Sequence, residues 1–171
     1  MNANKMREME IEKVTLNFGA GKDADLLEKG IALIKMIAGK QPVKTFTTKR
    51  IPEWGVRPGL PLGCKITLRG KEAELVLQRL LKAKAHVLNK RSFSPGNFAF
   101  GIPEYIDMPD VKYNPDLGIL GFEVAVTLKR PGFRIKYRKK QKRKIKPRHA
   151  ISTDETIKFA QEKLNIKLGE E

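Results

Sequence analysis

The sequence predicts an α+β fold in which helices pack on one face of an antiparallel sheet, the other face stays open, and a basic extension projects from the body. Three segments, 11–18, 64–69 and 121–129, alternate apolar and polar residues, as strands with one buried face do. Helix signals separate them, an order typical of a sheet with helices on one side. The 171 residues, 40% of them hydrophobic, suffice for one core, so we expect a single domain over 1–171.

The first strand is expected at 11–18, and the glycines of 19–21 end it. Asp23 or Asp25 can then cap a helix, which we expect to end before Gly39 because glycine favours helix C-termini. The apolar side of this helix is formed by Leu26, Leu27, Ile31, Ile34 and Ile37.

The middle of the chain predicts two further strands around a loop. Segment 43–49 is rich in threonine and favours a strand, whereas 50–63 has three prolines and three glycines and predicts a loop with stiff corners. That loop is long enough for a functional role. The strand at 64–69 follows, and then a helix over 71–84. This helix has Leu75, Leu80 and Leu81 available to the core.

The C-terminal part begins with 92–113, whose glycines, prolines and aromatics predict short strands and turns. The clearest strand, 121–129, comes next. Ser152 and Glu155 then have the spacing of a capping box, which predicts a helix to about Leu164. Its apolar stripe is formed by Ile157, Ala160 and Leu164.

Most of the excess charge lies in one segment. The net charge is +16, and 129–148 holds twelve basic residues and no acidic one. An internal block of this kind, followed by a helix, is more typical of a phosphate-binding extension than of a solvated tail or a localisation signal. Over 133–138, aromatic or aliphatic residues alternate with basic ones, which predicts a strand or ribbon with one basic face.

A charge excess of this size predicts an anionic partner, and nucleic acid fits best. No apolar run approaches the roughly 20 residues of a membrane-spanning helix, so we expect no membrane partner. The single cysteine, Cys64, excludes an internal disulfide framework and favours a reducing compartment. A cytoplasmic location is therefore expected.

No motif predicts catalysis, a metal site or a cofactor. Residues 19–22 lack the first glycine of a phosphate-binding loop and the Ser or Thr that follows its lysine. His86 and His149 have no cysteine or carboxylate at metal-ligand spacing, and His86 is expected on a helix surface. Cys64 alternates with apolar residues and is expected in the core rather than as a nucleophile. We expect neither an enzyme nor a cofactor.

The polar side of the strands is the surface left for a ligand. It is expected to carry Lys13, Thr15, Asn17, Lys65, Thr67 and Arg69. The only tryptophan, Trp54, lies in the 50–63 loop. It either stacks on a base or ribose or folds back to hold the loop on the sheet, and its amphipathic ring suits both equally.

Six short motifs occur in an order and spacing that together are specific, although several are weak alone. They are IEKVTLNFG at 11–19, QPVKT at 41–45, RPGLPLG at 57–63, TLRG at 67–70, GNFAFGI at 96–102 and ILGF at 119–122. With them, nearly the whole chain resembles the 5S-rRNA-binding large-subunit ribosomal protein family L-five in its archaeal form. The basic block before the last helix resembles the archaeal and eukaryotic members, because bacterial ones lack it.

The resemblance implies an antiparallel sheet that binds 5S rRNA on its open face. At the matching positions the binding residues are Lys13, Asn17, Gln41 and Thr67, to which we add Arg69 from the same polar face. Large-subunit rRNA phosphates are the expected contacts of the basic extension. The cations expected there are Arg134, Lys136, Arg138, Lys139, Lys140, Lys142, Arg143, Lys144, Lys146 and Arg148.

The resemblance also implies that the 50–63 loop approaches P-site tRNA, with Arg50, Trp54 and Arg57 as the contacts that we expect. Neighbouring proteins of the central protuberance and of the small-subunit head are implied partners. We therefore expect a structural constituent of the large ribosomal subunit that attaches 5S rRNA at the central protuberance. The alternatives are a ribosome assembly factor or an RNA-modifying enzyme with a basic arm, and a DNA regulator. The enzyme lacks a visible cofactor loop or acid–base pair, and the regulator lacks a helix-turn-helix or finger pattern.

Overall fold

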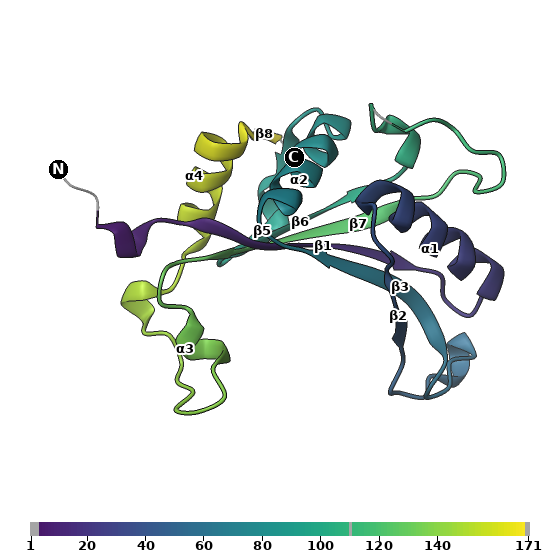
Figure 1. Ribbon diagram of the computed structural model, residues 1–171, viewed down its shortest axis with the longest axis horizontal. Coiled ribbons are helices and arrows are strands. Elements are labelled where there is room, and N and C mark those ends of the chain that lie inside the picture. The colour runs from purple at the N-terminus through teal and green to yellow at the C-terminus, as the bar shows by residue number, and fades with distance from the viewer. Residues whose placement is uncertain (1–3, 110, 170–171) are drawn as a thin grey trace.

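The computed structural model, which describes residues 4–109 and 111–169, is built on a six-stranded antiparallel sheet (Figure 1). The expected domain of 1–171 thus extends past the described residues at both ends. The strand order is β2-β3-β1-β7-β6-β5, and a separate parallel pair joins β4 to β8. The strands are β1 Glu10–Gly19, β2 Val43–Phe46, β3 Pro61–Leu68, β4 Val87–Asn89, β5 Phe93–Ser94, β6 Asn97–Ile102, β7 Phe122–Lys129 and β8 Lys167–Gly169.

Three of the four α-helices in the described ranges cover one face of this sheet, and the opposite face carries none of them (Figure 1). The helices are α1 Ala24–Ala38, α2 Lys71–Ala83, α3 Arg134–Tyr137 and α4 Thr153–Leu164, and short 3-10 turns lie at Lys5–Arg7, Pro52–Trp54, Lys90–Ser92, Tyr105–Asp107 and Pro147–His149. Helix α3 lies away from the covered face. The predicted α+β architecture, with helices on one side of an antiparallel sheet, is confirmed.

Helix α1 follows its sequence signals closely. The Asp23 carboxylate accepts hydrogen bonds from the backbone N–H groups of Asp25 and Leu26, and Gly39 ends the helix in the left-handed conformation at φ 67°. The helix lies directly on β1, because a Cβ at Gly30 would overlap the ring of Phe18. The buried side of α1 therefore includes Gly30, which the apolar pattern does not reveal.

Helix α2 corrects one expectation. Leu75 is 62% exposed, whereas the expected Leu80 and Leu81 are fully buried. The reason is helical spacing, since residues 73, 76, 77, 80 and 81 form one continuous stripe and Leu75 lies beside it. The prediction for His86 is also wrong: it follows the helix in a turn at φ 57°, partly buried, with Nδ1 3.2 Å from the carbonyl of Leu164.

Helix α4 begins as predicted with a capping box. Ser152 Oγ accepts from the backbone N–H of Glu155, and the Glu155 carboxylate accepts from the backbone N–H of Ser152. The helix ends at Leu164, and Ile157 and Ala160 are buried against the sheet. The Glu155 carboxylate also contacts the basic extension, through Arg130.

The 133–138 segment is not a strand or ribbon. It forms α3, in which the backbone N–H of Arg138 donates to the carbonyl of Arg134 at 2.9 Å. Strand β7, from which the segment emerges, already has β1 on one side and β6 on the other, so β7 offers it no free edge. Without a partner strand, local helical hydrogen bonds are the way to satisfy this backbone.

The predicted 50–63 loop is more ordered than expected. Strand β2 stops at Phe46 rather than Lys49, and β3 already begins at Pro61, because proline is tolerated as the first residue of a strand. Between them, Thr47 and Gly59 remain linked by a backbone hydrogen bond of 2.9 Å. The segment 47–60, which we call the projecting loop, is therefore a hairpin-like excursion of the sheet.

Candidate nucleic-acid interface

The face of the sheet opposite the helices, which we call the open face, is formed by side chains from five strands. The register sets Thr15 of β1 opposite Thr67 of β3 on one side and Ala125 of β7 on the other. Ala125 in turn faces Ala99 of β6. Applied along the strands, the pairing gives the members of the face as Lys13, Thr15, Asn17, Val43, Thr45, Lys65, Thr67, Asn97, Ala99, Gly101, Glu123, Ala125 and Thr127.

Most side chains of the open face are small. Its centre is formed by threonine, alanine and glycine, and its longer polar side chains lie around them. A surface with few long side chains lets a ribose–phosphate backbone or a base edge approach the strands closely. Threonine and asparagine supply neutral donors and acceptors for 2′-hydroxyl groups and base edges. The arrangement suits recognition by shape and hydrogen bonding rather than by bulk charge.

Asn17 is held in place by a residue far away in the chain. Its Nδ2 donates a hydrogen bond of 3.1 Å to the carboxylate of Glu123 on β7. Its other amide atom, Oδ1, is left to accept from a ligand. Because the pair orients the amide before anything binds, less side-chain freedom is lost on binding.

A β-bulge at the edge of the open face places Lys13. The β1–β7 register shifts between Ile11 and Lys13, so Glu12 is an extra residue that strict alternation would have turned toward the helices. Glu12 accepts from Tyr137 Oη at 3.4 Å and lies 3.7 Å from Arg69 Nη1. Arg69 directly follows β3, so it lies at the edge of the open face, where its guanidinium forms an ion pair with the Glu12 carboxylate.

Gln41 lies outside the network that holds these residues together. It is exposed and precedes β2, which begins at Val43, and Val43 pairs with Lys65 at the edge of the sheet. Of the expected sheet residues, the structure therefore places Lys13, Asn17 and Thr67 on one surface. Arg69 and Gln41 lie at the ends of the neighbouring strands.

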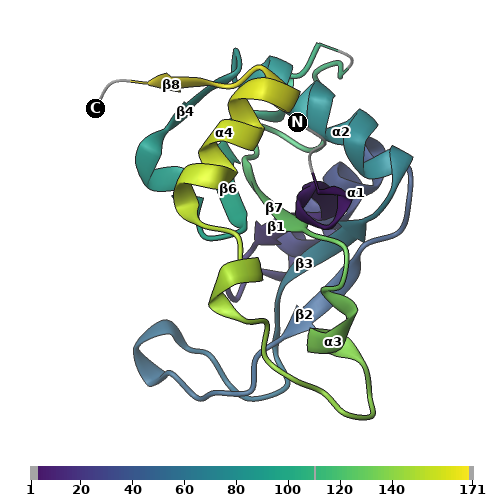
Figure 2. The ribbon, with the colours of Figure 1, turned by 90° about the vertical axis from the view of Figure 1, so that its left-hand side faces the viewer.

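Two projections extend from the sheet on the side of the open face, away from α1, α2 and α4 (Figures 1 and 2). One is the projecting loop and the other is the basic extension, which leaves β7 after Lys129 and returns to the core at Ile151. In Figure 1 the open face spans the space between them. The two projections therefore flank the open face.

The projecting loop presents its three expected side chains to solvent. Trp54 is 68% exposed, and Arg50 and Arg57 are exposed as well. The residue that fixes the loop is Val56, which is 4% exposed and exchanges two backbone hydrogen bonds of 3.0 Å with Ile51. Of the two interpretations of Trp54, the structure thus excludes the one in which its ring folds back as the fixing residue.

The basic extension divides into a structural base and a solvent-facing tip. At its base, Arg130 is 4% exposed and Lys129 forms an ion pair of 3.4 Å with Glu10, so both contribute to the fold. Arg138 is partly buried, and its Nε donates to the carbonyl of Gln141 at 2.9 Å. The exposed cations are Arg134, Lys136, Lys139, Lys140, Lys142, Arg143, Lys144, Lys146 and Arg148.

The two ends of the extension are joined through Arg130. Its Nη2 lies 2.7 Å from Glu155 Oε1, and its Nη1 donates to the carbonyl of Ala150 at 3.0 Å. His149 Nε2 lies 2.8 Å from the carbonyl of Pro131. The hydrogen bond from the Ser152 backbone, and after it the Arg130 guanidinium, keep the pKa of Glu155 below its ordinary value. This cluster fixes the extension to the cap of α4.

The remaining chemistry of the described residues is structural. Cys64 is fully buried, and this burial raises the pKa of its thiol to about 11, so the thiol stays protonated at neutral pH. Within 4–109 and 111–169, no three His, Cys, Asp or Glu side chains are grouped to hold a metal ion. No helix in the described part of the chain is long and apolar enough to cross a membrane.

The half of the open face that β6 and β7 contribute was not predicted from the sequence. In β6, Phe98, Phe100 and Ile102 are buried, so Asn97, Ala99 and Gly101 turn to the open face. The signal was present as the alternation within 97–102. Only the strand order shows that these residues continue the surface of β1 and β3.

Comparisons with known proteins identify a family. The family model described as "Ribosomal protein L5" matches residues 4–57, and the model for the C-terminus of the same ribosomal protein family matches residues 61–159. The chain is 45% identical to the large ribosomal subunit protein uL5 of Nanoarchaeum equitans, covering 95% of this chain and 97% of the relative. It is 41% identical to the protein of that name from Sulfurisphaera tokodaii, covering 98% and 96%, and 39% identical to the one from Methanobrevibacter smithii, covering 95% and 96%.

Proposed function

The chain belongs to the ribosomal protein L5 family, and on this premise we propose that it attaches 5S rRNA to the large ribosomal subunit through its open face. Proteins of this family are structural constituents of the cytoplasmic ribosome rather than enzymes. The observation that carries the proposal is the open face itself, whose side chains are mostly small and neutral and which lies between two projections rich in basic residues.

On the open face, Asn17 and Thr67 recognise the RNA and Lys13 neutralises a phosphate. Their amide and hydroxyl groups can hydrogen-bond to base edges and to 2′-hydroxyl groups, and the 2′-hydroxyl groups distinguish RNA from DNA. Gln41 and Arg69 extend this surface along the ends of the neighbouring strands. These five residues form the proposed 5S rRNA site.

The exposed cations of the basic extension contact large-subunit rRNA phosphates. Attraction between many lysines and phosphates is strong but nonspecific, and it releases counterions. The extension is fixed at its base by Arg130 and Glu155, so its tip can adapt to the rRNA surface. In this proposal the open face selects the RNA and the extension adds affinity.

The projecting loop is the candidate contact for P-site tRNA. Arg50 and Arg57 suit phosphates, and the exposed Trp54 ring suits stacking on a base or ribose. Neighbouring proteins of the central protuberance and of the small-subunit head are further proposed partners.

A single domain over 1–171 is part of the proposal. Strand β1 belongs to the segment that the first family model matches, and it lies between β3 and β7, which belong to the segment that the second family model matches.

The test is a comparison of binding to 5S rRNA, an unrelated structured RNA and duplex DNA, each at several salt concentrations. We expect selective binding of 5S rRNA that persists as salt rises, because neutral contacts are little screened. Equal affinity for all three nucleic acids at every salt concentration contradicts the proposed 5S function and leaves a general polyanion binder.

A further inference from the structure

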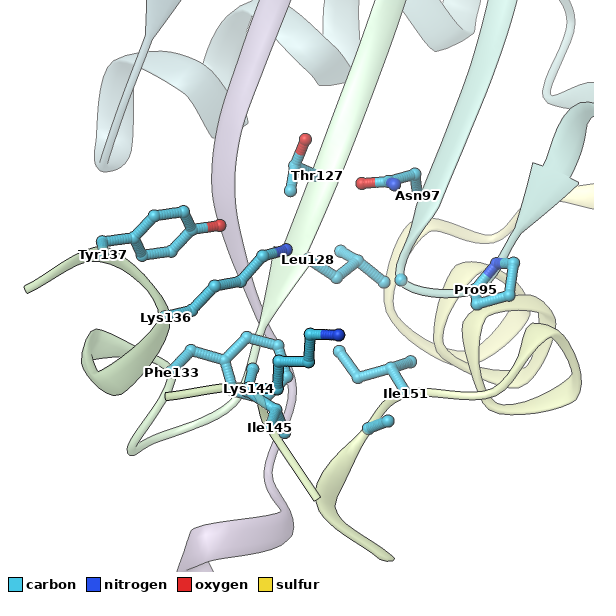
Figure 3. Close-up of a pocket in the computed structure, with 12 residues that line it drawn as sticks. Pro95, Asn97, Thr127, Leu128, Phe133, Lys136, Tyr137, Lys144, Ile145 and Ile151 are labelled. Atoms are coloured by element: carbon cyan, nitrogen blue, oxygen red, sulfur yellow. The ribbon is translucent and has the colours of Figure 1, made fainter. Parts of the chain in front are cut away.

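The base of the basic extension encloses a pocket next to the open face (Figure 3). Its volume is about 320 Å³, and it lies where the extension folds back over the end of β7 and the turn between β5 and β6. Small-ligand sites measure roughly 300–1,000 Å³, so the pocket has room for one small ligand and not for a folded peptide.

The walls of the pocket are apolar and include two aromatic rings. Phe133 and Tyr137 are four residues apart and face the same side of the short α3 turn, opposite Ile151 (Figure 3). Phe133 is held edge-on by the His149 ring, with 5.6 Å between the ring centroids, and Tyr137 Oη reaches Glu12 at 3.4 Å. Both rings are therefore positioned by residues outside the pocket.

The polar groups of the pocket are cationic or neutral. The side chains of Lys136 and Lys144 extend over it (Figure 3), and none of the described residues that line it carries a carboxylate. Asn97 and Thr127, which pair directly across β6 and β7, lie at the side where the pocket meets the open face. The pocket thus offers an apolar slot, two ammonium groups and two hydrogen-bonding side chains.

We propose that this pocket binds one unstacked nucleotide of the RNA that lies on the open face. The base enters the slot between the aromatic and aliphatic walls, and Asn97 and Thr127 hydrogen-bond to its edge. Lys136 and Lys144 neutralise the adjoining phosphate. The inference rests on the proposed RNA function, and it adds a site to which a single base is recruited.

Charge and continuity both favour a nucleotide as the occupant. A purely apolar ligand leaves the two ammonium groups without an anionic partner. A bare phosphate pairs with them but leaves the apolar slot unfilled. Asn97 and Thr127 belong to both the pocket and the open face, so an RNA strand on the sheet reaches the pocket without crossing a gap.

The first test follows backbone amide signals by NMR while the four nucleoside monophosphates, or ribose 5-phosphate as a control without a base, are added to the full chain. Nucleotides are expected to shift the signals of Asn97, Thr127 and Ile151, whereas ribose 5-phosphate shifts only signals around Lys136 and Lys144. Shifts that are the same with and without a base, or no shifts at these positions up to about 10 mM nucleotide, overturn the pocket. This result does not depend on which RNA the protein prefers.

The second test fills the pocket and measures affinity for 5S rRNA. Ala150 lines the pocket with an exposed side chain at an ordinary φ of −63°, so Ala150→Leu adds bulk there without backbone strain. Ala32→Leu makes the same change on the exposed side of α1. We expect Ala150→Leu to weaken binding about five- to tenfold with an unchanged salt dependence, and Ala32→Leu to have no effect.

A pair of substitutions at Tyr137 separates stacking from packing. Tyr137→Phe keeps the ring and loses only the long, exposed contact to Glu12, so it is expected to bind 5S rRNA nearly as well as the unaltered protein. Tyr137→Leu keeps an apolar side chain but loses the ring, and it is expected to bind about fivefold more weakly or worse. If the unaltered protein selects 5S rRNA and both Ala150→Leu and Tyr137→Leu bind it normally, the pocket proposal fails and the proposed function stands.

Discussion

The open face and the basic extension are the two proposed RNA contacts, but they are built in opposite ways. The open face is held by a six-stranded sheet whose core residues Val14, Leu16 and Val124 are fully buried. The extension has a four-residue helix and a 3-10 turn, and most of its cations are exposed. One region is rigid and mostly neutral, and the other is loosely structured and strongly charged.

A rigid neutral surface and a loosely structured, charged one suit different kinds of RNA contact. A hydrogen-bonding surface selects a partner only when its groups keep a fixed geometry, which requires a packed core beneath them. Attraction between lysines and phosphates tolerates variable geometry, because it acts over a Debye length of about 8–10 Å. In the proposed function, recognition therefore belongs to the sheet and attraction to the extension.

The largest effect is expected from removing charge at the tip of the extension. Replacing Lys139, Lys140, Lys142 and Lys146 with glutamine should weaken binding to every structured RNA. The slope of log affinity against log salt should fall by about 3 to 4, which is about one for each lost phosphate contact. Affinity measured from low to physiological salt checks this.

The matched control for the lysine set lies on the covered side of the sheet. Lys29, Lys35 and Lys82 are exposed on α1 and α2. Changing these three to glutamine should alter the salt slope much less. An equal change per charge in the two sets means that the extension has no special role.

The next effect is on folding at the base of the extension. Arg130→Met removes the partly buried ion pair to Glu155 and the hydrogen bond to the carbonyl of Ala150, and we expect the free energy of unfolding to fall by about 2–3 kcal/mol. Urea denaturation checks it. Lys129→Met, which removes an exposed ion pair to Glu10, should cost less than about 1 kcal/mol. Similar losses for the two variants mean that Arg130 does not hold the extension to α4.

A smaller effect is expected on the open face. Thr67→Ala or Asn17→Ala should each weaken 5S rRNA binding by about 1 kcal/mol, or roughly fivefold, and leave the salt slope unchanged because no charge is removed. Gln78→Ala, which truncates an exposed amide on α2, is the control. If both sheet variants bind 5S rRNA normally, the site is not on this face.

The smallest effect concerns pH. The pKa of Glu155 is lowered by the Ser152 backbone hydrogen bond and by Arg130, so its ionised form stabilises the fold. This contribution is complete above the ordinary pKa of 4.5 and is lost as pH falls through the lowered value. Because the carboxylate is partly exposed, at most about 1 kcal/mol is involved. As pH falls below 4.5, the unfolding free energy of Glu155→Gln should therefore decrease less than that of the unaltered protein. An unchanged pH dependence means that ionisation of Glu155 does not stabilise the fold.

Local signals in the chain were enough to predict the features that depend on near neighbours. Alternation predicted the buried faces of β1, β3 and β7, and the capping signals at Asp23 or Asp25, at Gly39 and at Ser152 predicted where helices begin or end. These signals are reliable because the groups that satisfy one another lie within a few residues. The position of the charge block and the polar faces of β1 and β3 followed in the same way.

Features that depend on distant residues were settled only by the folded arrangement. The strand order brings Glu123 to Asn17 across 106 positions, adds β6 and β7 to the open face, and leaves 133–138 without a free edge of β7. The bulge at Glu12 and the pocket beneath Lys136 and Lys144 likewise exist only once the extension and the sheet have met. Such contacts leave no periodic signal in the chain, because each is fixed by packing between segments whose separation in sequence is arbitrary.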